Sequence, residues 1–289
     1  MFTFDARQRS GWNPGGFRPQ SLSQRLSLLL LGFSAALSPA VRAAPAAADC
    51  PERLRVDFLD TAAEPHLLGD IRERPEPAGM LVDSLRHAIK TSGCAPQLTL
   101  GRVPNIRAAM RLKSGEADLF GGITRSNPFS ADFALPPLRP GAPAMEQAAG
   151  EVSFSLYTKP PSKVLWREGK LSLPAGQVVG VSKGTGMEQI ALRQGWPVDL
   201  APNNESLIRK QSIGRTAAIL LPDLLAQKLV ADLGLHRLDP PVWREPFYVA
   251  ASLDFQSRHP VFLNWIWTAL CHRQAEQLGR APACSEFRP

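Results

Sequence analysis

The stretch Ile106–Thr124, IRAAMRLKSGEADLFGGIT, combines a helix, a turn and a strand. Asn105 is a residue type that caps helices, and Gly115 can end one. The apolar residues expected to share the inward face of this helix are Ile106, Ala109, Met110 and Leu112. Asp118 then opens the apolar run DLFGGI, which is typical of a buried strand. A helix that leads directly into a buried strand predicts βαβ units and a parallel sheet.

The same alternation extends to both sides of this stretch. Upstream, Leu54–Leu59 is strand-like, and a helix follows Gly79 and ends at Gly93. The stripe expected to be buried on that helix is Leu81, Val82, Leu85, Ala88 and Ile89. Downstream, the apolar runs VVGVS and TAAILL alternate with helical patterns, the last of them over 259–278. Helices capped by Asn204 and begun by Pro222 are expected among them.

Two further apolar runs, Val152–Lys159 and Pro246–Ser252, are expected to cross between the two series. We therefore predict an α/β fold of two lobes, each a mostly parallel sheet flanked by helices, joined by two hinge strands. Lobe 1 is expected to comprise residues 50–151 and 250–289, and lobe 2 residues 152–249. In such folds ligands bind at the carboxyl ends of the strands, in the cleft between lobes.

The N-terminus has the layout of a secretory signal peptide. The apolar run Leu26–Leu37 follows Arg18 and Arg25 and precedes a small-residue cleavage region at Ala43. A membrane anchor is the alternative, but a span needs about twenty apolar residues and this run is shorter. We predict that residues 1–43 are removed and that the mature protein is periplasmic.

The charge balance does not indicate a nucleic-acid partner. The 289 residues carry a formal net charge of +7, but residues 1–43 contain five arginines and one aspartate, so the mature chain carries +3. Its lysines and arginines are spread among acidic residues, whereas nucleic-acid binding needs a concentrated basic face. With 44% hydrophobic and 20% charged residues the chain is globular.

All four cysteines lie in the predicted mature chain, which in an exported protein indicates disulfides. Three pairings are possible, and proximity favours Cys271 with Cys284, which leaves Cys50 with Cys94. A metal site at Cys271, His272 and Cys284 lacks any C-x-x-C pair. We expect no metal and no cofactor.

Gly180–Gly184 matches G-x-S-x-G, the pattern of a hydrolase nucleophile turn centred here on Ser182. Acids and histidines follow in the required order, but most chains offer that order by chance. An upstream oxyanion loop of the HGGG kind is missing from the sequence, and so is a phosphate-binding G-x-x-x-x-G-K-[ST] loop. We expect a protein that is not an enzyme, and a serine hydrolase remains the alternative.

Four stretches, in this order and spacing, resemble the type II periplasmic solute-binding proteins, and within them the polar amino-acid-binding group of ABC importers. They are GMLVDSLRHAIKTSG, IRAAMRLKSGEADLFGGIT, LPAGQVVGVSKGTGMEQ and SLIRKQSIGRTAAILLPD. The resemblance covers nearly all of Leu54–Gly279. It implies a monomer that captures a small polar or anionic, amino-acid-like ligand for a membrane permease or a sensor. A family member that has lost ligand binding and serves as an accessory protein is a further alternative.

The resemblance also implies which residues contact the ligand: Asp60, Gly122, Ile123, Thr124, Arg125, Thr185, Gly186 and Asp223. Amides at the start of the helix after Gly184 would favour an anion facing Thr124. Two positions depart from the family pattern. Asn127 stands where the family has an arginine for the ligand carboxylate, and Pro222 where it has an acid for the ligand amine, with Asp223 one residue later.

Overall fold

The computed structural model describes residues 49–73, 76, 78–138, 145, 147–279 and 284, with the backbone alone at 227–231. The signal peptide expected over residues 1–43 lies outside the described residues. Within the described ranges, no helix is long and apolar enough to cross a membrane.

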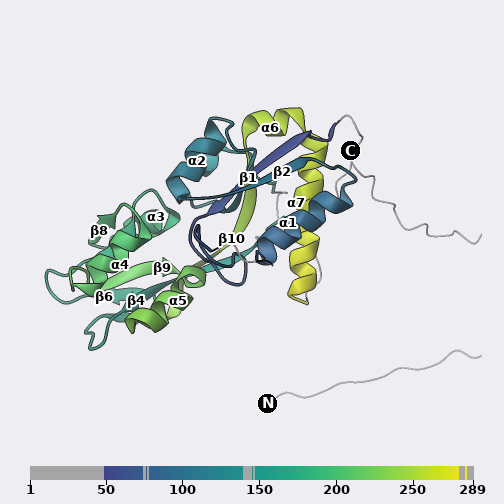
Figure 1. Ribbon diagram of the computed structural model, residues 1–289. Helices are drawn as coiled ribbons and strands as arrows, with labels where there is room; N and C mark the ends of the chain where they lie inside the picture. The colour runs from purple at the N-terminus through teal and green to yellow at the C-terminus, as the bar shows by residue number, and fades with distance from the viewer. Residues whose placement is uncertain are drawn as a thin grey trace, which may run out of the picture. The chain divides into compact units, whose positions relative to one another are not determined.

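An eight-stranded mixed sheet runs through the molecule in the order β2-β1-β3-β10-β4-β9-β7-β8 (Figure 1). Its strands are β1 (Arg53–Leu59), β2 (Gln97–Val103), β3 (Leu119–Thr124), β4 (Gly150–Thr158), β7 (Val179–Ser182), β8 (Val198–Ala201), β9 (Ala218–Pro222) and β10 (His236–Ala251). A separate hairpin comprises β5 (Leu165–Arg167) and β6 (Lys170–Ser172). β1 is parallel to β2 and β3, and β7 is parallel to β8 and β9. These two parallel groups are the sheets of the two lobes.

The strands β4 and β10 connect the two groups. β10 pairs with β4 in antiparallel fashion from His236 to Phe247, with an irregularity between Leu238 and Trp243, and with β3 from Phe247 to Ala251. β4 in turn pairs with β9. The expected α/β fold with two hinge strands is therefore confirmed, although β10 begins ten residues before the expected crossing run at Pro246. The lobe limits at 151/152 and 249/250 stay a prediction.

Seven helices are described: α1 (Met80–Thr91), α2 (Asn105–Lys113), α3 (Gly186–Arg193), α4 (Asn204–Ser212), α5 (Asp223–Leu233), α6 (Leu253–Arg258) and α7 (Pro260–Gln277). In α1 the expected stripe is buried as predicted, and α1 lies beside α7 (Figure 1). In α2 the prediction was wrong for Ile106 and Met110, which are 39% and 66% exposed. Ala109 and Leu112 are buried as predicted. Ala108 also faces the core, because small side chains allow α2 to lie close to β1 and β3.

Several element boundaries also differ from the expectations. Asn203, not Asn204, caps α4, since its side chain accepts a hydrogen bond from the Ser206 amide at 2.8 Å. Pro222 ends β9, so α5 begins at Asp223. The closing helix expected over 259–278 is α7, and a separate short helix, α6, precedes it and ends at Arg258, just before His259 and Pro260.

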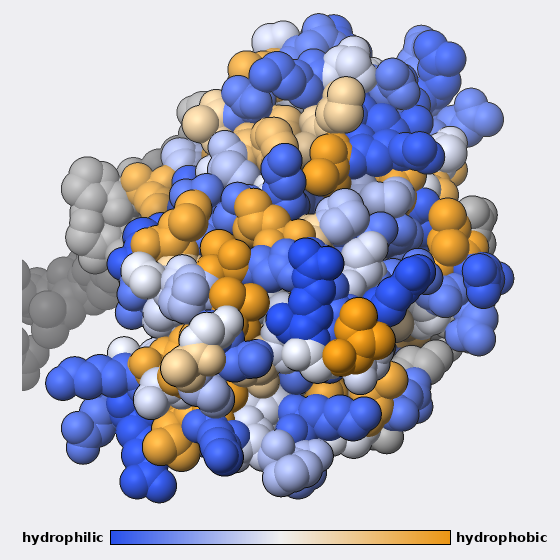
Figure 2. All heavy atoms as spheres, turned by 90° about the vertical axis from the view of Figure 1, so that its left-hand side faces the viewer, coloured by the Kyte–Doolittle hydropathy of each residue, from blue (hydrophilic) through white to orange (hydrophobic). Residues whose placement is uncertain are grey.

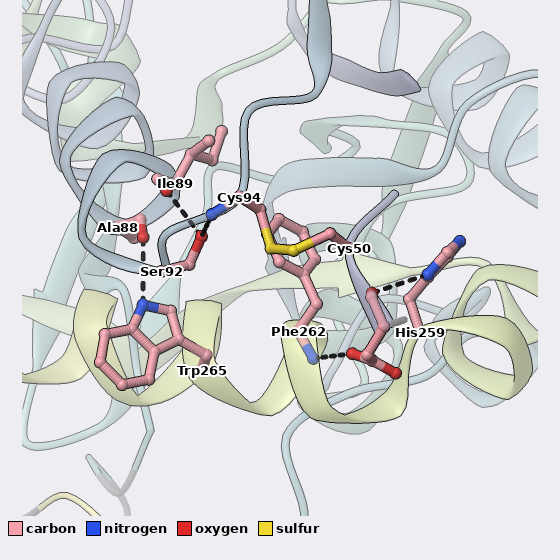
Figure 3. The surroundings of a disulfide bond; sticks show 9 residues. Cys50, Ala88, Ile89, Ser92, Cys94, His259, Phe262 and Trp265 are labelled. Carbon is pink, nitrogen blue, oxygen red and sulfur yellow. Dashed lines mark hydrogen bonds between the residues drawn. A yellow bond between two sulfur atoms is a disulfide. The ribbon is translucent and has the colours of Figure 1, made fainter. Parts of the chain in front are cut away.

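The structure joins Cys50 to Cys94 and Cys271 to Cys284, which confirms the favoured pairing. Figure 3 shows how the first bond lies between the start of the described chain, the end of α1 and the start of α7. Asp49 accepts the Phe262 amide proton through its carboxylate and lies 2.9 Å from His259 Nδ1 through its carbonyl oxygen. A residue remote in sequence thereby satisfies a free amide at the beginning of α7.

Candidate functional site

A cleft of about 490 Å³ opens at the carboxyl ends of strands from both lobes. Asp60 follows β1 and Thr124 ends β3, while Ser182 ends β7 and Pro222 ends β9, and all four residues line the cleft. Aliphatic and aromatic side chains such as Leu67, Phe154 and Phe247 form its apolar walls. Apolar walls with a few converging polar groups are typical of sites for small molecules. Among the described residues no cluster of three or more His, Cys, Asp or Glu could hold a metal ion.

The loop after β1 supplies Asp60, Thr61 and His66 to the cleft. Arg102 of β2 holds this loop in place, since its guanidinium donates to the backbone carbonyls of Leu59, Thr61, Leu68 and Gly69. The Thr61 hydroxyl donates to the Asp60 carboxylate at 3.2 Å. An arginine that binds a loop through four carbonyls fixes the backbone conformation on which the Asp60 carboxylate depends.

His66 is half-buried, and its ring meets Phe247 edge to face with centroids 5.0 Å apart. Burial lowers the pKa of His66 below its ordinary value, because the charged imidazolium loses solvation. At neutral pH the ring is therefore an uncharged aromatic wall of the cleft with one polar edge.

This pKa shift predicts a pH dependence of stability. The unfolded chain binds the His66 proton more tightly than the folded protein does. The stability that His66 contributes is therefore fully present above about pH 6.5 and declines as the pH falls below that value. Urea unfolding at pH 7.5 and pH 5.5 should show a smaller loss for His66→Phe than for the wild type. His87→Gln on the exposed face of α1 is the control, and an unchanged loss in His66→Phe would contradict the assignment.

The end of β3 presents alternate residues to the cleft. Gly122 and Thr124 line it, whereas Ile123 between them is 1% exposed and packs in the core. This division follows from the two-residue period of a strand. Asn127 also lines the cleft, but its carboxamide oxygen accepts the Phe129 amide at 3.0 Å within the turn after β3.

The structure places Arg125 outside the cleft. Its guanidinium donates to the Pro136 carbonyl and lies over the Tyr248 ring, with Cζ 4.7 Å from the centroid. Asp223 is likewise outside the cleft lining. It accepts from the Tyr157 hydroxyl at 2.8 Å and forms an ion pair with Arg237 at 3.2 Å. The expected ligand contacts that the cleft brings together are thus Asp60, Gly122, Thr124, Thr185 and Gly186.

The turn before α3 is held by its own side chains. Glu188 accepts the Gly184 amide at 2.7 Å, and the Thr185 hydroxyl donates to the Ser182 carbonyl at 2.6 Å. Ser182 is 3% exposed, and its hydroxyl donates to the Asn204 carboxamide oxygen at 2.7 Å. Ser182 therefore connects β7 to α4, and its hydroxyl is aimed at an amide rather than at a histidine base.

Sequence reasoning missed one charged residue beside the site, Glu245 of β10. It is 8% exposed, and its carboxylate accepts hydrogen bonds from the Ser126 hydroxyl and, at 3.3 Å, from the Ser126 amide. The Ser126 hydroxyl also lies 3.2 Å from that of Thr124. A Cβ built on Gly186 would overlap the same hydroxyl, so the end of β3 and the start of α3 are in contact here.

Comparison with solved structures shows the fold. A mutant of ArgBP from T. maritima superposes with a TM-score of 0.57 at 16% identity, covering 79% of this chain and 91% of that one. The fold is that of the type II periplasmic binding proteins. The ancestral amino acid-binding protein AncCDT-1, a precursor of cyclohexadienyl dehydratase, has a TM-score of 0.56 at 18% identity and covers 79% and 91%.

The amino acid ABC transporter substrate-binding protein AbpA from Streptococcus pneumoniae, bound to L-arginine, also has a TM-score of 0.56, at 17% identity, covering 79% and 90%. No family model and no curated protein matches the chain. The type II fold is therefore shown by structural similarity alone. The candidate site lies at the carboxyl ends of the strands, where open α/β sheets commonly bind ligands.

Proposed function

We propose that the protein is an exported solute-binding protein that captures a small polar, amino-acid-like ligand in the cleft between its lobes. The observation that supports this most is the 490 Å³ cleft, where side chains from the ends of β1, β3, β7 and β9 converge. The two lobes are joined by β4 and β10, an arrangement that allows hinge closure around a ligand. The paired cysteines fit an oxidising compartment such as the periplasm.

We propose that the protein delivers its bound ligand to an ABC-type importer. A membrane sensor is the alternative partner. The structures that superpose on the chain include an amino acid ABC transporter substrate-binding protein. On the face shown in Figure 2, hydrophobic residues lie in small groups among hydrophilic ones, the ordinary pattern of a folded protein's surface. A monomeric state is part of the same proposal.

The charged lining of the cleft qualifies the expectation of an anionic ligand. Lys183 and the beginning of α3 favour an anion, whereas Asp60 and Glu205 favour a cation. Lys183 and Glu205 are exposed and Asp60 is partly buried, so Asp60 is the best shielded from solvent of these three. The Asp70 carboxylate, also in the lining, accepts the amides of Arg72 and Glu73 in its own turn.

A ligand panel tests the proposed function directly. Amino acids, dicarboxylates, polyamines and sugars should be screened by thermal shift, because a ligand that binds the folded state alone raises the melting temperature. One chemical class should give concentration-dependent stabilisation. Silence across the whole panel would contradict solute binding and favour an accessory protein of the same fold.

We predict that Asp60→Asn weakens binding of any ligand found in this way by about tenfold or more. A hydrogen bond to a charged group contributes about 1.5–3 kcal/mol, and the amide keeps the shape of the carboxylate without its charge. Isothermal titration calorimetry should show the loss in Asp60→Asn. Glu151→Gln, an exposed acid on β4, is the matched control and should bind as the wild type does. Equal affinity in both variants would remove Asp60 from the site.

A further inference from the structure

The Glu245 carboxylate lies behind the cleft lining, bonded to Ser126 next to the position where an anionic ligand group was expected. That position lies between Thr124 at the end of β3 and Gly186 at the start of α3. The Ser126 hydroxyl contacts both of these residues and donates to Glu245. Glu245 comes from β10, 119 residues further along the chain, and is 8% exposed.

Three donors near this position, those of Ser126 and Gly184, are already engaged. Both polar hydrogens of Ser126, on the amide and on the hydroxyl, are donated to Glu245. The Gly184 amide, at the other side of this position, is donated to Glu188. A ligand carboxylate that entered here would have to displace one of these internal carboxylates or remain without these donors, and an unpaired buried charge is costly.

Arg125, the cation next to Thr124 in the sequence, is directed elsewhere, and Lys183 of the cleft lining is exposed to solvent. Arg125 binds the Pro136 carbonyl and stacks on Tyr248. Two residues later, Asn127 stands where the family that the sequence resembles has an arginine. None of the described lysines or arginines forms an ion pair with Glu245. Two carboxylates brought together at a buried position repel each other, whereas an ammonium group is attracted.

We propose that Glu245 is a specificity-determining residue that takes the place of a ligand carboxylate. The cleft therefore accepts a small organic amine that lacks a carboxylate, and Asp60 is the acid that receives its charge. This inference rests on the proposed function, and it narrows the ligand class of the same site. It accounts for three features together: the buried acid, the asparagine at position 127 and the outward course of Arg125.

Matched ligand pairs that differ only in the carboxylate test the inference. The pairs are arginine and agmatine, lysine and cadaverine, and histidine and histamine, each titrated into the protein by calorimetry and thermal shift. At least one amine should bind about tenfold or more tightly than its amino acid. A modest repulsion between the ligand carboxylate and Glu245 is enough for a tenfold difference in affinity. An amino acid that binds as tightly as its amine would overturn the inference and leave solute binding standing.

A second arm assigns the selectivity to Glu245. Glu245→Gln keeps an acceptor for Ser126 but removes the charge, so the preference for amines should shrink by about tenfold, while Glu151→Gln should leave it unchanged. An undiminished preference in Glu245→Gln would overturn the role of this residue. Silence from all three amines, with another class of the wider panel binding, would overturn the amine class alone. Silence from every compound would instead refute the proposed function.

Discussion

Replacing Cys50 and Cys94 together by alanine should lower the free energy of unfolding by about 4 kcal/mol, the largest effect we expect from a change outside the cleft. The bond closes a loop with a sequence separation of 44 residues, and the entropy lost by the unfolded chain grows with that length. It also holds Asp49 where its carboxylate meets the Phe262 amide (Figure 3). Guanidinium unfolding should show the loss, and the melting temperature should fall by about 10 °C.

The second disulfide is the internal standard for this prediction. Cys271 and Cys284 are separated by 13 residues, so their double alanine variant should lose about 3 kcal/mol, less than the first. The order of the two losses is the critical result. If the Cys271 and Cys284 variant proved the less stable of the two, the loop-length account and the anchoring of the N-terminal segment would both be wrong.

Much of the fold could be predicted because local patterns carry it. The apolar stripe of α1 is read directly from the helical period, and Gly93 adopts φ +78° at the end of that helix as predicted. The alternation of strands and helices was sufficient for the α/β class and for β4 as a crossing strand. These features depend on residues a few positions apart, so the sequence shows them without any knowledge of tertiary contacts.

The errors come from contacts between distant segments. The hydrophobic stripe assigned to α2 placed Met110 inside, but the helix approaches β1 and β3 through its alanines. The contact of Glu245 with Ser126 joins positions that no local pattern relates. The Arg125 guanidinium could bind a carboxylate, but in the structure it lies over the Tyr248 ring and donates to the Pro136 carbonyl. The charges near a cleft built from strand ends of two lobes therefore depend on contacts that no local pattern shows, and the ligand contacts themselves stay a prediction.

The loop that carries His66 depends on one glycine. Gly79 precedes α1 with φ 111° and ψ 160°, a region of backbone space that is essentially restricted to glycine. A Cβ at this position would lie 2.5 Å from the His66 carbonyl oxygen and 2.8 Å from its carbonyl carbon. The amides of Met80 and Leu81 bind the carbonyls of Pro65 and His66, so the loop and the helix start are one unit.

Gly79→Ala should therefore destabilise the protein by about 3 kcal/mol or more, the sum of a backbone penalty and a clash with main-chain atoms that cannot rotate away. Because His66 lines the cleft, ligand affinity should fall as well. Gly93→Ala, beyond the other end of α1, is the matched control, since Gly93 also has a positive φ but no atom within 4 Å of a built Cβ. It should lose only about 1–2 kcal/mol and retain full affinity. Equal losses of stability would show that the backbone conformation alone matters and that Gly79 has no special part in placing His66.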